Sequence, residues 1–212
     1  MTEKFLSPTR RSLLLAVAAT LALAGCGSLL GPSNPPAQIY RLQPAFPPSG
    51  AQGPPVSWQL AVSAPDVSRT LETDRIALLR GARMDYYADA QWSDSVPRLV
   101  QQLLVEAFEK SGRIPAVARE SGGLHADYSL ESEIRDFDAQ YDNGDAPPLV
   151  IVEIEAKLVN TRGEVVASLD ARQTARASQN SVDSVVAAFD QASDAALAQI
   201  VTWTLQAPSP KP

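Results

Sequence analysis

The stretch from Arg75 to Arg113 constrains the fold of this 212-residue chain more than any other segment. Its second half is predicted to be one amphipathic helix, because apolar residues recur at the i, i+3, i+4, i+7 spacing of a single helical face. These residues are Val96, Leu99, Val100, Leu103, Leu104, Ala107 and Phe108. Ser93 or Asp94 is the expected N-cap, and Pro97 falls in the first turn, where its missing N–H costs little. Gly112 is expected to end the helix in a left-handed conformation.

A β-hairpin is predicted just before this helix, with two short strands on either side of Gly81. Neighbouring residues on a strand point to opposite faces, so one of Tyr86 and Tyr87 can lie in the core while the other is exposed. Tyrosine, tryptophan and arginine are common anchors of protein interfaces. We therefore take Tyr86, Tyr87, Trp92 and Arg80 as candidate partner contacts, with packing inside the domain as the alternative for the aromatic residues.

Further strands are expected where apolar and polar residues alternate, with glycine-containing turns between them. In chain order they cover residues 57–62, 114–119, 128–137, 150–158 and 165–171, with a loop at 65–70 and turns at 142–145 and 160–163. A second long helix is predicted after its N-cap, Ser181. Its apolar side consists of Val182, Val185, Val186, Phe189, Leu197, Ile200 and Val201, and Asp183, Asp190 and Gln191 are expected to face outward. We predict a single α+β domain over residues 56–206, a mostly antiparallel sheet with two main amphipathic helices packed on one face.

Residues 1–25 are predicted to be a lipoprotein signal peptide. Basic residues precede an apolar run, Leu13 to Ala24, that is too short for the roughly 20 residues a spanning helix needs. The sequence Leu23-Ala24-Gly25-Cys26 matches a bacterial lipobox, so Cys26 is expected to carry a diacylglyceryl group and to anchor the chain through several acyl chains, such as palmitate. An ordinary secretory leader is the alternative.

The expected destination is the outer membrane, with the chain facing the periplasm, because Gly27 is not the aspartate that retains such lipoproteins in the inner membrane. Arg10-Arg11 also resembles a twin-arginine export signal, and both this route and the general secretory route stay open. Residues 26–55 are predicted to form a semi-rigid, Pro/Gly-rich tether that contains a short strand near 39–42, expected to dock on the domain edge. Its free part is expected to reach about 35 Å at most, at roughly 3.1 Å per residue. Residues 207–212 are predicted to be a disordered tail.

Composition excludes several classes of function. The formal charge is −6, and removing a leader with three basic residues and one acidic residue lowers it to −8. An acidic chain without a basic cluster argues against nucleic-acid binding. With Cys26 the only cysteine and His125 the only histidine, thiolate clusters are excluded and few zinc or histidine-based catalytic sites remain.

The remaining sequence motifs indicate no metal, no cofactor and no enzyme. The acidic run from Asp136 to Asp145 lacks the glycine that a calcium loop needs at its sixth position. No phosphate-binding loop and no nucleophile elbow occur in the sequence. A hydrolase that uses His125, Glu131 and Glu133 is the most remote alternative.

The block Tyr86-Tyr87-Ala88-Asp89-Ala90-Gln91-Trp92-Ser93-Asp94, followed by Pro97 and the helix end Phe108–Arg113, resembles the ABC-type transport auxiliary lipoproteins, the group of paraquat-inducible protein C. The resemblance runs from about Ile39 to about Trp203, with Ile39–Leu42 as a second match. It implies an accessory lipoprotein that docks or assembles a lipid transport system without catalysis.

The resemblance also implies partners, namely a protein with a mammalian-cell-entry (MCE) domain and an ABC permease with its ATPase. A homo-oligomer is possible. Two alternatives remain open at this point: an envelope lipoprotein that activates a cell-wall synthase or a secretion assembly, and a lipid-binding carrier with its own cavity.

Overall fold

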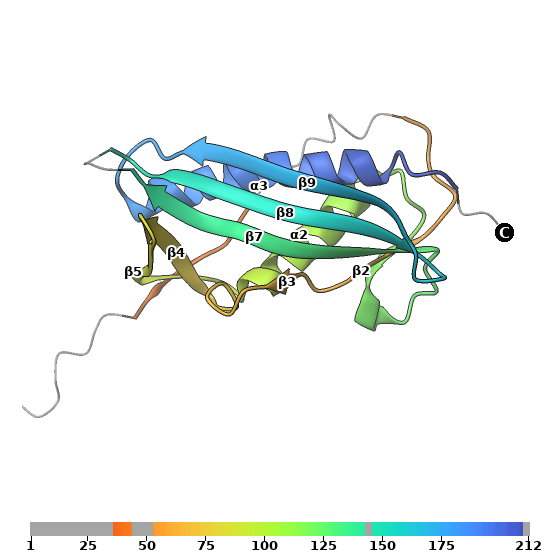
Figure 1. Cartoon of the computed structure of the whole chain (residues 1–212), viewed down its shortest axis with the longest axis horizontal. Coiled ribbons are helices and arrows are strands. Elements are labelled where there is room, and N and C mark those ends of the chain that lie inside the picture. The colour runs from red at the N-terminus through yellow and green to blue at the C-terminus, as the bar shows by residue number, and fades with distance from the viewer. Residues whose placement is uncertain (1–35, 44–52, 143–145, 210–212) are drawn as a thin grey trace, which may run out of the picture. The chain divides into compact units, whose positions relative to one another are not determined.

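A nine-stranded mixed sheet and two long helices make up the part of the chain that the computed structural model describes, residues 36–43, 53–142 and 146–209 (Figure 1). The helices are α2 (Val96–Ser111) and α3 (Val182–Thr204), and a short 3-10 helix, η3, covers Glu120–Gly122. The strands are β1 (Gln38–Tyr40), β2 (Leu60–Val62), β3 (Asp66–Val67), β4 (Arg75–Arg80), β5 (Arg83–Trp92), β6 (Val117–Arg119), β7 (Tyr128–Tyr141), β8 (Leu149–Asn160) and β9 (Val165–Arg176). The predicted α+β class is confirmed.

The long strand β7 organises the sheet. On one side it pairs with β8 in an antiparallel ladder, which continues from β8 to β9. On its other side β2, β3 and β4 follow one another along β7, each in parallel. The outermost strands are β5 and β1 beyond β4, and β6 beyond β2. Most of the paired residues therefore lie in antiparallel ladders, as predicted, and the short parallel pairings join distant segments to β7.

Strand β7 continues to Tyr141, past the end predicted near Phe137. A bulge between Ile134 and Asp136 inserts one residue, so that Phe137 faces the core together with Ile134. The predicted inward face of β8 is confirmed, because Val150, Val152, Ile154, Ala156 and Leu158 are all buried. The Asn-Gly turn predicted between β7 and β8 lies at residues 143–145, outside the described residues.

Both long helices form where the periodicity predicts them. All seven apolar residues of the α2 stripe are buried, and Gly112 ends the helix with φ 64°. Its N-cap is Ser95 rather than Ser93 or Asp94, and the Asp94 carboxylate accepts the Ser95 N–H at 2.7 Å. Ser181 caps α3 as predicted, since its side chain accepts the N–H of Ser184.

Three aromatic rings join the sheet to α3. Trp92 of β5 lies with its ring centroid 5.1 Å from that of Phe189 and 6.0 Å from that of Phe137, in edge-to-face geometry. The Phe137 and Phe189 centroids are 4.9 Å apart. All three side chains are almost completely buried, so this cluster lies inside the core between the layers.

Several predicted boundaries differ in the structure. Strand β6 begins at Val117 rather than at 114, and β9 continues to Arg176 rather than ending at 171. The expected half-buried strand at 57–62 is only β2, and its three residues are all buried. The expected loop at 65–70 contains β3, which pairs with β7. Part of the expected disordered tail is bonded to the domain instead: Ala207 N–H donates to Thr204 O at 3.0 Å, and Tyr128 Oη donates to Pro208 O at 2.9 Å.

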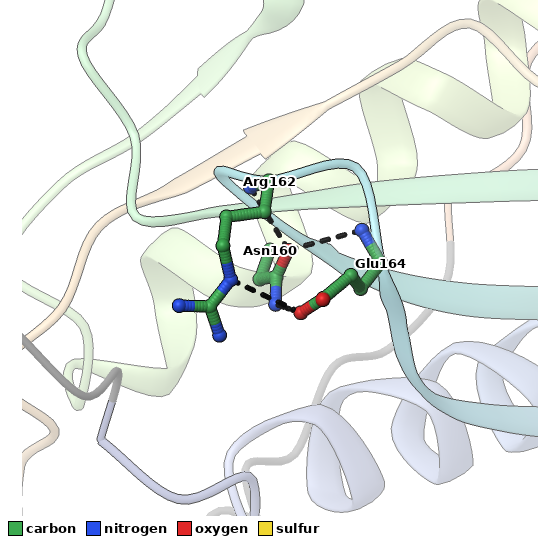
Figure 2. Close-up of polar contacts among 3 residues, drawn as sticks. All are labelled: Asn160, Arg162 and Glu164. Carbon is green, nitrogen blue, oxygen red and sulfur yellow. Dashed lines mark hydrogen bonds and ion pairs between the residues drawn. The ribbon is translucent and has the colours of Figure 1, made fainter.

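The turn between β8 and β9 is held by the side chain of Asn160 (Figure 2). Its Oδ1 accepts the backbone N–H groups of Arg162 at 2.9 Å and Glu164 at 3.0 Å. Its Nδ2 donates to Glu164 Oε2 at 2.7 Å, and Arg162 Nε donates to the same oxygen at 3.1 Å. Gly163 supplies the positive φ, 77°, that closes the turn.

Replacing Asn160 with alanine is expected to lower the free energy of unfolding by about 1 kcal/mol, because two backbone N–H groups lose their acceptor in an exposed turn where water partly replaces it. Urea denaturation would measure the change. Thr161→Ala, at an exposed position in the same turn, is the matched control and should cost less than about 0.5 kcal/mol. Equal effects of the two substitutions would contradict this role of Asn160.

Candidate functional site

The β4–β5 hairpin places Arg80 at one end of the sheet. Gly81, with φ 61°, forms the tight turn, so Arg80 pairs with Arg83 across the hairpin. On its other side Arg80 is in register with Tyr141, the last residue of β7. The hairpin turn and the end of β7 therefore bring an arginine beside a tyrosine.

Tyr87, Tyr141, Asn180 and Arg80 form a connected group, which we call the tyrosine cluster. The hydroxyls of Tyr87 and Tyr141 lie 2.8 Å apart, and Tyr141 Oη donates to Asn180 Oδ1 at 2.8 Å. Because Tyr141 has one proton to donate, Tyr87 is the donor between the two hydroxyls. The guanidinium of Arg80 lies over the Tyr141 ring, with Cζ 4.4 Å from the centroid.

Burial raises the pKa of Tyr87 well above its ordinary value, and the hydrogen bond to Tyr141 raises it further. Tyr87 is therefore a neutral hydrogen-bond donor throughout the physiological pH range. It is not an anionic base or nucleophile. The cluster is built for packing and hydrogen bonding.

Tyr86 has separate contacts. Its hydroxyl donates to Thr70 O at 2.7 Å, and the Arg75 guanidinium carbon lies 4.0 Å from the ring centroid. Their alternation on the strand allowed one of the two tyrosines to be in the core and the other exposed. Both are instead half-buried, because Tyr86 contacts Thr70 and Arg75, whereas the Tyr87 hydroxyl is hydrogen-bonded to Tyr141.

Trp92 is placed differently from the other three contact candidates. Its side chain is 1% exposed and packs on Phe137 and Phe189, so the described surface does not present this ring to a partner. Of the candidates, Arg80 is exposed, and Tyr86 and Tyr87 are half-buried. The structure brings Arg80 and Tyr87 together through Tyr141.

Strand β1 pairs in parallel with β5, at the edge of the domain where the sequence predicted that this segment docks. The same segment is also hydrogen-bonded to α3. The Tyr40 hydroxyl lies 2.8 Å from Asp183 Oδ1, and Gln43 N–H donates to Asp190 Oδ1 at 2.7 Å. Burial and the adjacent Asp183 raise the pKa of Tyr40, and burial raises that of Asp190. Asp190 was expected to face outward and is instead half-buried against the β1 segment.

The residues suggested for a hydrolase lie on exposed surface. His125 lies between η3 and β7, and Glu131 and Glu133 project from β7 on the face away from the helices. Glu131 is opposite Lys157 of β8, and Glu133 is opposite Glu155. Within residues 36–43, 53–142 and 146–209, histidine, cysteine and carboxylate side chains do not gather in a group of three that would suit a metal ion. None of the helices in these ranges has the length and apolar character of a membrane span.

Sequence reasoning missed two members of the tyrosine cluster. Tyr141 continues the alternation of Phe137 and Ala139 on β7, so an extension of the strand pattern would have found it. Asn180 lies in the segment between β9 and α3 and carries no local signal. Its position depends on how α3 packs against the sheet.

The model of one protein family, described as the ABC-type transport auxiliary lipoprotein component, matches residues 40–201. This range extends from β1 into α3 and so contains nearly all of the described domain. The chain belongs to this family. As an ABC-type transport auxiliary lipoprotein, it falls in a class of envelope lipoproteins associated with ABC transport systems.

Two individual relatives of this auxiliary lipoprotein are informative. A crystal structure of a Xanthomonas campestris protein is 33% identical, with a TM-score of 0.74, and the match covers 80% of this chain and 95% of that one. An uncharacterized protein of Bradyrhizobium diazoefficiens is 31% identical over 152 residues, 72% of this chain and 41% of that protein. The chain thus spans less than half the length of this second relative. A further crystal structure, of an uncharacterized protein, has a TM-score of 0.63 at 16% identity and shares the fold.

Proposed function

We propose that this auxiliary lipoprotein is a non-catalytic docking component of an ABC-type system that moves lipid or another hydrophobic solute. In this proposal the acylated Cys26 anchors it to the periplasmic face of the outer membrane, and its partners are an MCE-domain protein and the permease with its ATPase. The observation that carries the proposal is the family match across residues 40–201. Cys26 itself lies outside the described residues.

The surface that we propose for the partner contains Arg80, Tyr86 and Tyr87. Arginine and tyrosine give large contact area for little loss of side-chain entropy when they are already held in place. Here Tyr87 is fixed by the hydroxyl of Tyr141, Tyr86 by Thr70 O, and Arg80 by the ring of Tyr141. A partner that binds this end of the sheet therefore meets preorganised side chains.

The core packing favours docking over the lipid-carrier alternative. A carrier needs open space between its helices and its sheet to hold an acyl chain. In the described domain Trp92, Phe137 and Phe189 occupy the space between α3 and the sheet. The alternative of a cell-wall synthase activator differs from the proposed function in its binding partner, so identifying the partner distinguishes the two.

Affinity purification of the acylated protein from detergent-solubilised envelopes tests the proposal. Recovery of an MCE-domain protein together with its permease supports it, and Cys26→Ala provides the unanchored control. Recovery of cell-wall synthases without any transporter component would contradict it.

In the same purification, Tyr87→Ala and Arg80→Ala are each expected to reduce recovery of the transporter about tenfold, which corresponds to about 1.4 kcal/mol of binding free energy. Glu131→Ala, on the exposed face of β7, is the control and should leave recovery unchanged. Thermal melting of each variant checks that the domain is still folded. Unchanged recovery with folded Tyr87→Ala and Arg80→Ala proteins would exclude this end of the sheet as the contact surface.

A further inference from the structure

Strand β9 leaves one side of the sheet open. It pairs with β8 along its whole length, and no second strand pairs with it within the described residues. Figure 1 shows β9 at the edge of the layer formed by β7, β8 and β9, with α3 behind it. The strand has 12 residues and no proline, so its backbone N–H groups are all intact. A long open edge of this kind is a template for another strand.

The direction of the β9 backbone groups follows from one hydrogen bond. Ala177 N–H donates to Pro148 O at 3.0 Å, toward the β8 side. Since these groups alternate along an antiparallel strand, residues 171, 173 and 175 also face β8, and the even-numbered residues face the open edge. The residues with outward backbone groups are Ser168, Asp170, Arg172, Thr174 and Arg176.

The side chains of these same residues lie on the sheet face away from the helices, because Asp170 is opposite Glu155 and Arg172 is opposite Glu153. Asp170 and Arg172 are exposed and carry opposite charges two positions apart. Arg172 Nη1 contacts Asp136 at 2.9 Å and also Glu153. These contacts fix the guanidinium on the open face, and an arginine has further N–H donors on Nη2 and Nε.

This spacing complements itself in one antiparallel register. If two copies of β9 pair about a two-fold axis at Ala171, Asp170 of each copy lies opposite Arg172 of the other. If the axis moves to residue 170 or 172, two like charges lie directly opposite each other, which destabilises the pair. Charge therefore favours the register centred on Ala171 over its two neighbours. A register centred on Gln173 would also place Asp170 opposite an arginine, Arg176, but it pairs only residues 170–176, whereas the register centred on Ala171 uses almost the whole strand.

On the side of β9 that faces the helices, small side chains would allow a second strand to approach closely. Ala167, Ala171 and Ala175 are small. Beside them, a shallow surface hollow between β9 and α3 includes the half-buried side chains of Leu169 and Trp203. In a two-fold dimer, the apolar hollow of one copy and that of the other would lie on opposite sides of the symmetry axis.

We propose that β9 pairs with β9 of a second copy of this chain, antiparallel and centred on Ala171, to form a two-fold dimer with one continuous sheet. This inference rests on the open edge, the charge spacing and the adjacent apolar surface. It is independent of the proposed transport function.

Charge reversal tests the dimer in the full acylated protein, by sedimentation equilibrium in detergent. Asp170→Arg is expected to raise the dimer dissociation constant about tenfold or more, because two attractive pairs become repulsive. The double variant Asp170→Arg with Arg172→Asp restores opposite charges and should recover most of the affinity. Glu131→Arg, on the same sheet face but on β7, is the control and should have no effect.

Cysteine cross-linking tests the register directly, and it remains informative if the charge variants fold poorly. Two differently tagged copies, one with Asp170→Cys and the other with Arg172→Cys, are co-expressed and oxidised in the membrane. Hydrogen-bonded cross-strand pairs have Cα atoms about 5.5 Å apart, within the range of a disulfide. We expect a mixed dimer that exceeds the product of Glu131→Cys with Arg172→Cys. A monomer at all concentrations, cross-linking no stronger than this control, or capture of a different protein by the Asp170→Cys edge would overturn the proposal.

Discussion

Replacing Trp92 with alanine is expected to lower the free energy of unfolding by about 3–5 kcal/mol, the usual cost of removing a buried tryptophan. Its ring is buried among Phe137 and Phe189, so truncation removes two edge-to-face contacts and leaves a cavity between β5, β7 and α3. Because a domain of this size has a stability of roughly 5–15 kcal/mol, the loss is a large fraction of the total. Urea denaturation monitored by far-UV circular dichroism measures it.

Trp203→Ala is the matched control. This tryptophan lies near the end of α3 and is only partly buried, so we expect a loss of about 1–2 kcal/mol. A cost below about 1 kcal/mol for Trp92→Ala, or equal costs at the two positions, would contradict the central place of Trp92 in the core. The expectation also affects binding studies, because lost partner recovery in Trp92→Ala would report unfolding rather than a lost contact.

The helices and the β7–β8 ladder were predictable because their signals are local and repeated. The α2 stripe recurs over about four turns, and β8 alternates apolar and charged residues from Val152 to Leu158. The parallel strands were not predictable in this way. Strand β3 has two residues, too few to show a period, and its place beside β7 depends on a partner far along the chain. The end of β7 was placed too early, at Phe137, although the alternation that resumes after the bulge continues through Ala139 to Tyr141.

In the candidate site, too, the local arrangement was predictable from the sequence and the contacts with distant segments were not. The turn at Gly81 and the alternation of the hairpin predict that Arg80, Tyr86 and Tyr87 lie on neighbouring strands, and the structure has them there. Sequence reasoning cannot tell whether an aromatic side chain on such a hairpin is exposed, since that depends on what packs on it. For Trp92 the covering residue is Phe189 of α3, and for Tyr87 it is Tyr141 of β7, both supplied by distant parts of the chain.

A second large effect is expected at Asp138, a buried carboxyl on β7. Its side chain is 2% exposed and lies opposite Ile151 of β8, and its Oδ1 has no hydrogen-bond partner among the described residues. Burial raises its pKa to about 6, and the nearby charge of Asp136 adds to this increase. A hydrogen bond from Gln140 and the charge of Arg172 act in the opposite direction but are weaker. The folded state therefore binds this proton more tightly than the unfolded chain, where the pKa is about 3.9.

The sign of the pH dependence follows from that difference. Below about pH 4 Asp138 is protonated in both states and does not lower the free energy of unfolding. As the pH rises from about 4 through about 6, the free energy of unfolding falls, and above that range the loss is nearly constant. A difference of about two pKa units corresponds to about 3 kcal/mol of stability lost at pH 7.5. Asp138→Asn keeps the size of the side chain and removes the charge. It is expected to raise the free energy of unfolding by about 2–3 kcal/mol at pH 7.5 and to change it little at pH 4.

Urea denaturation of the wild-type protein and of Asp138→Asn at several pH values between 4 and 8 measures this effect as the difference between the two curves, which removes the contributions of other titrating groups. Glu131→Gln, an exposed carboxylate on the same strand, is the control and should follow the wild-type curve within about 0.5 kcal/mol. A difference between wild type and Asp138→Asn that is constant with pH would mean that Asp138 does not titrate in this range. In that case the unpartnered Oδ1 must be satisfied in solution, because an isolated charged carboxylate at this depth carries a large desolvation cost.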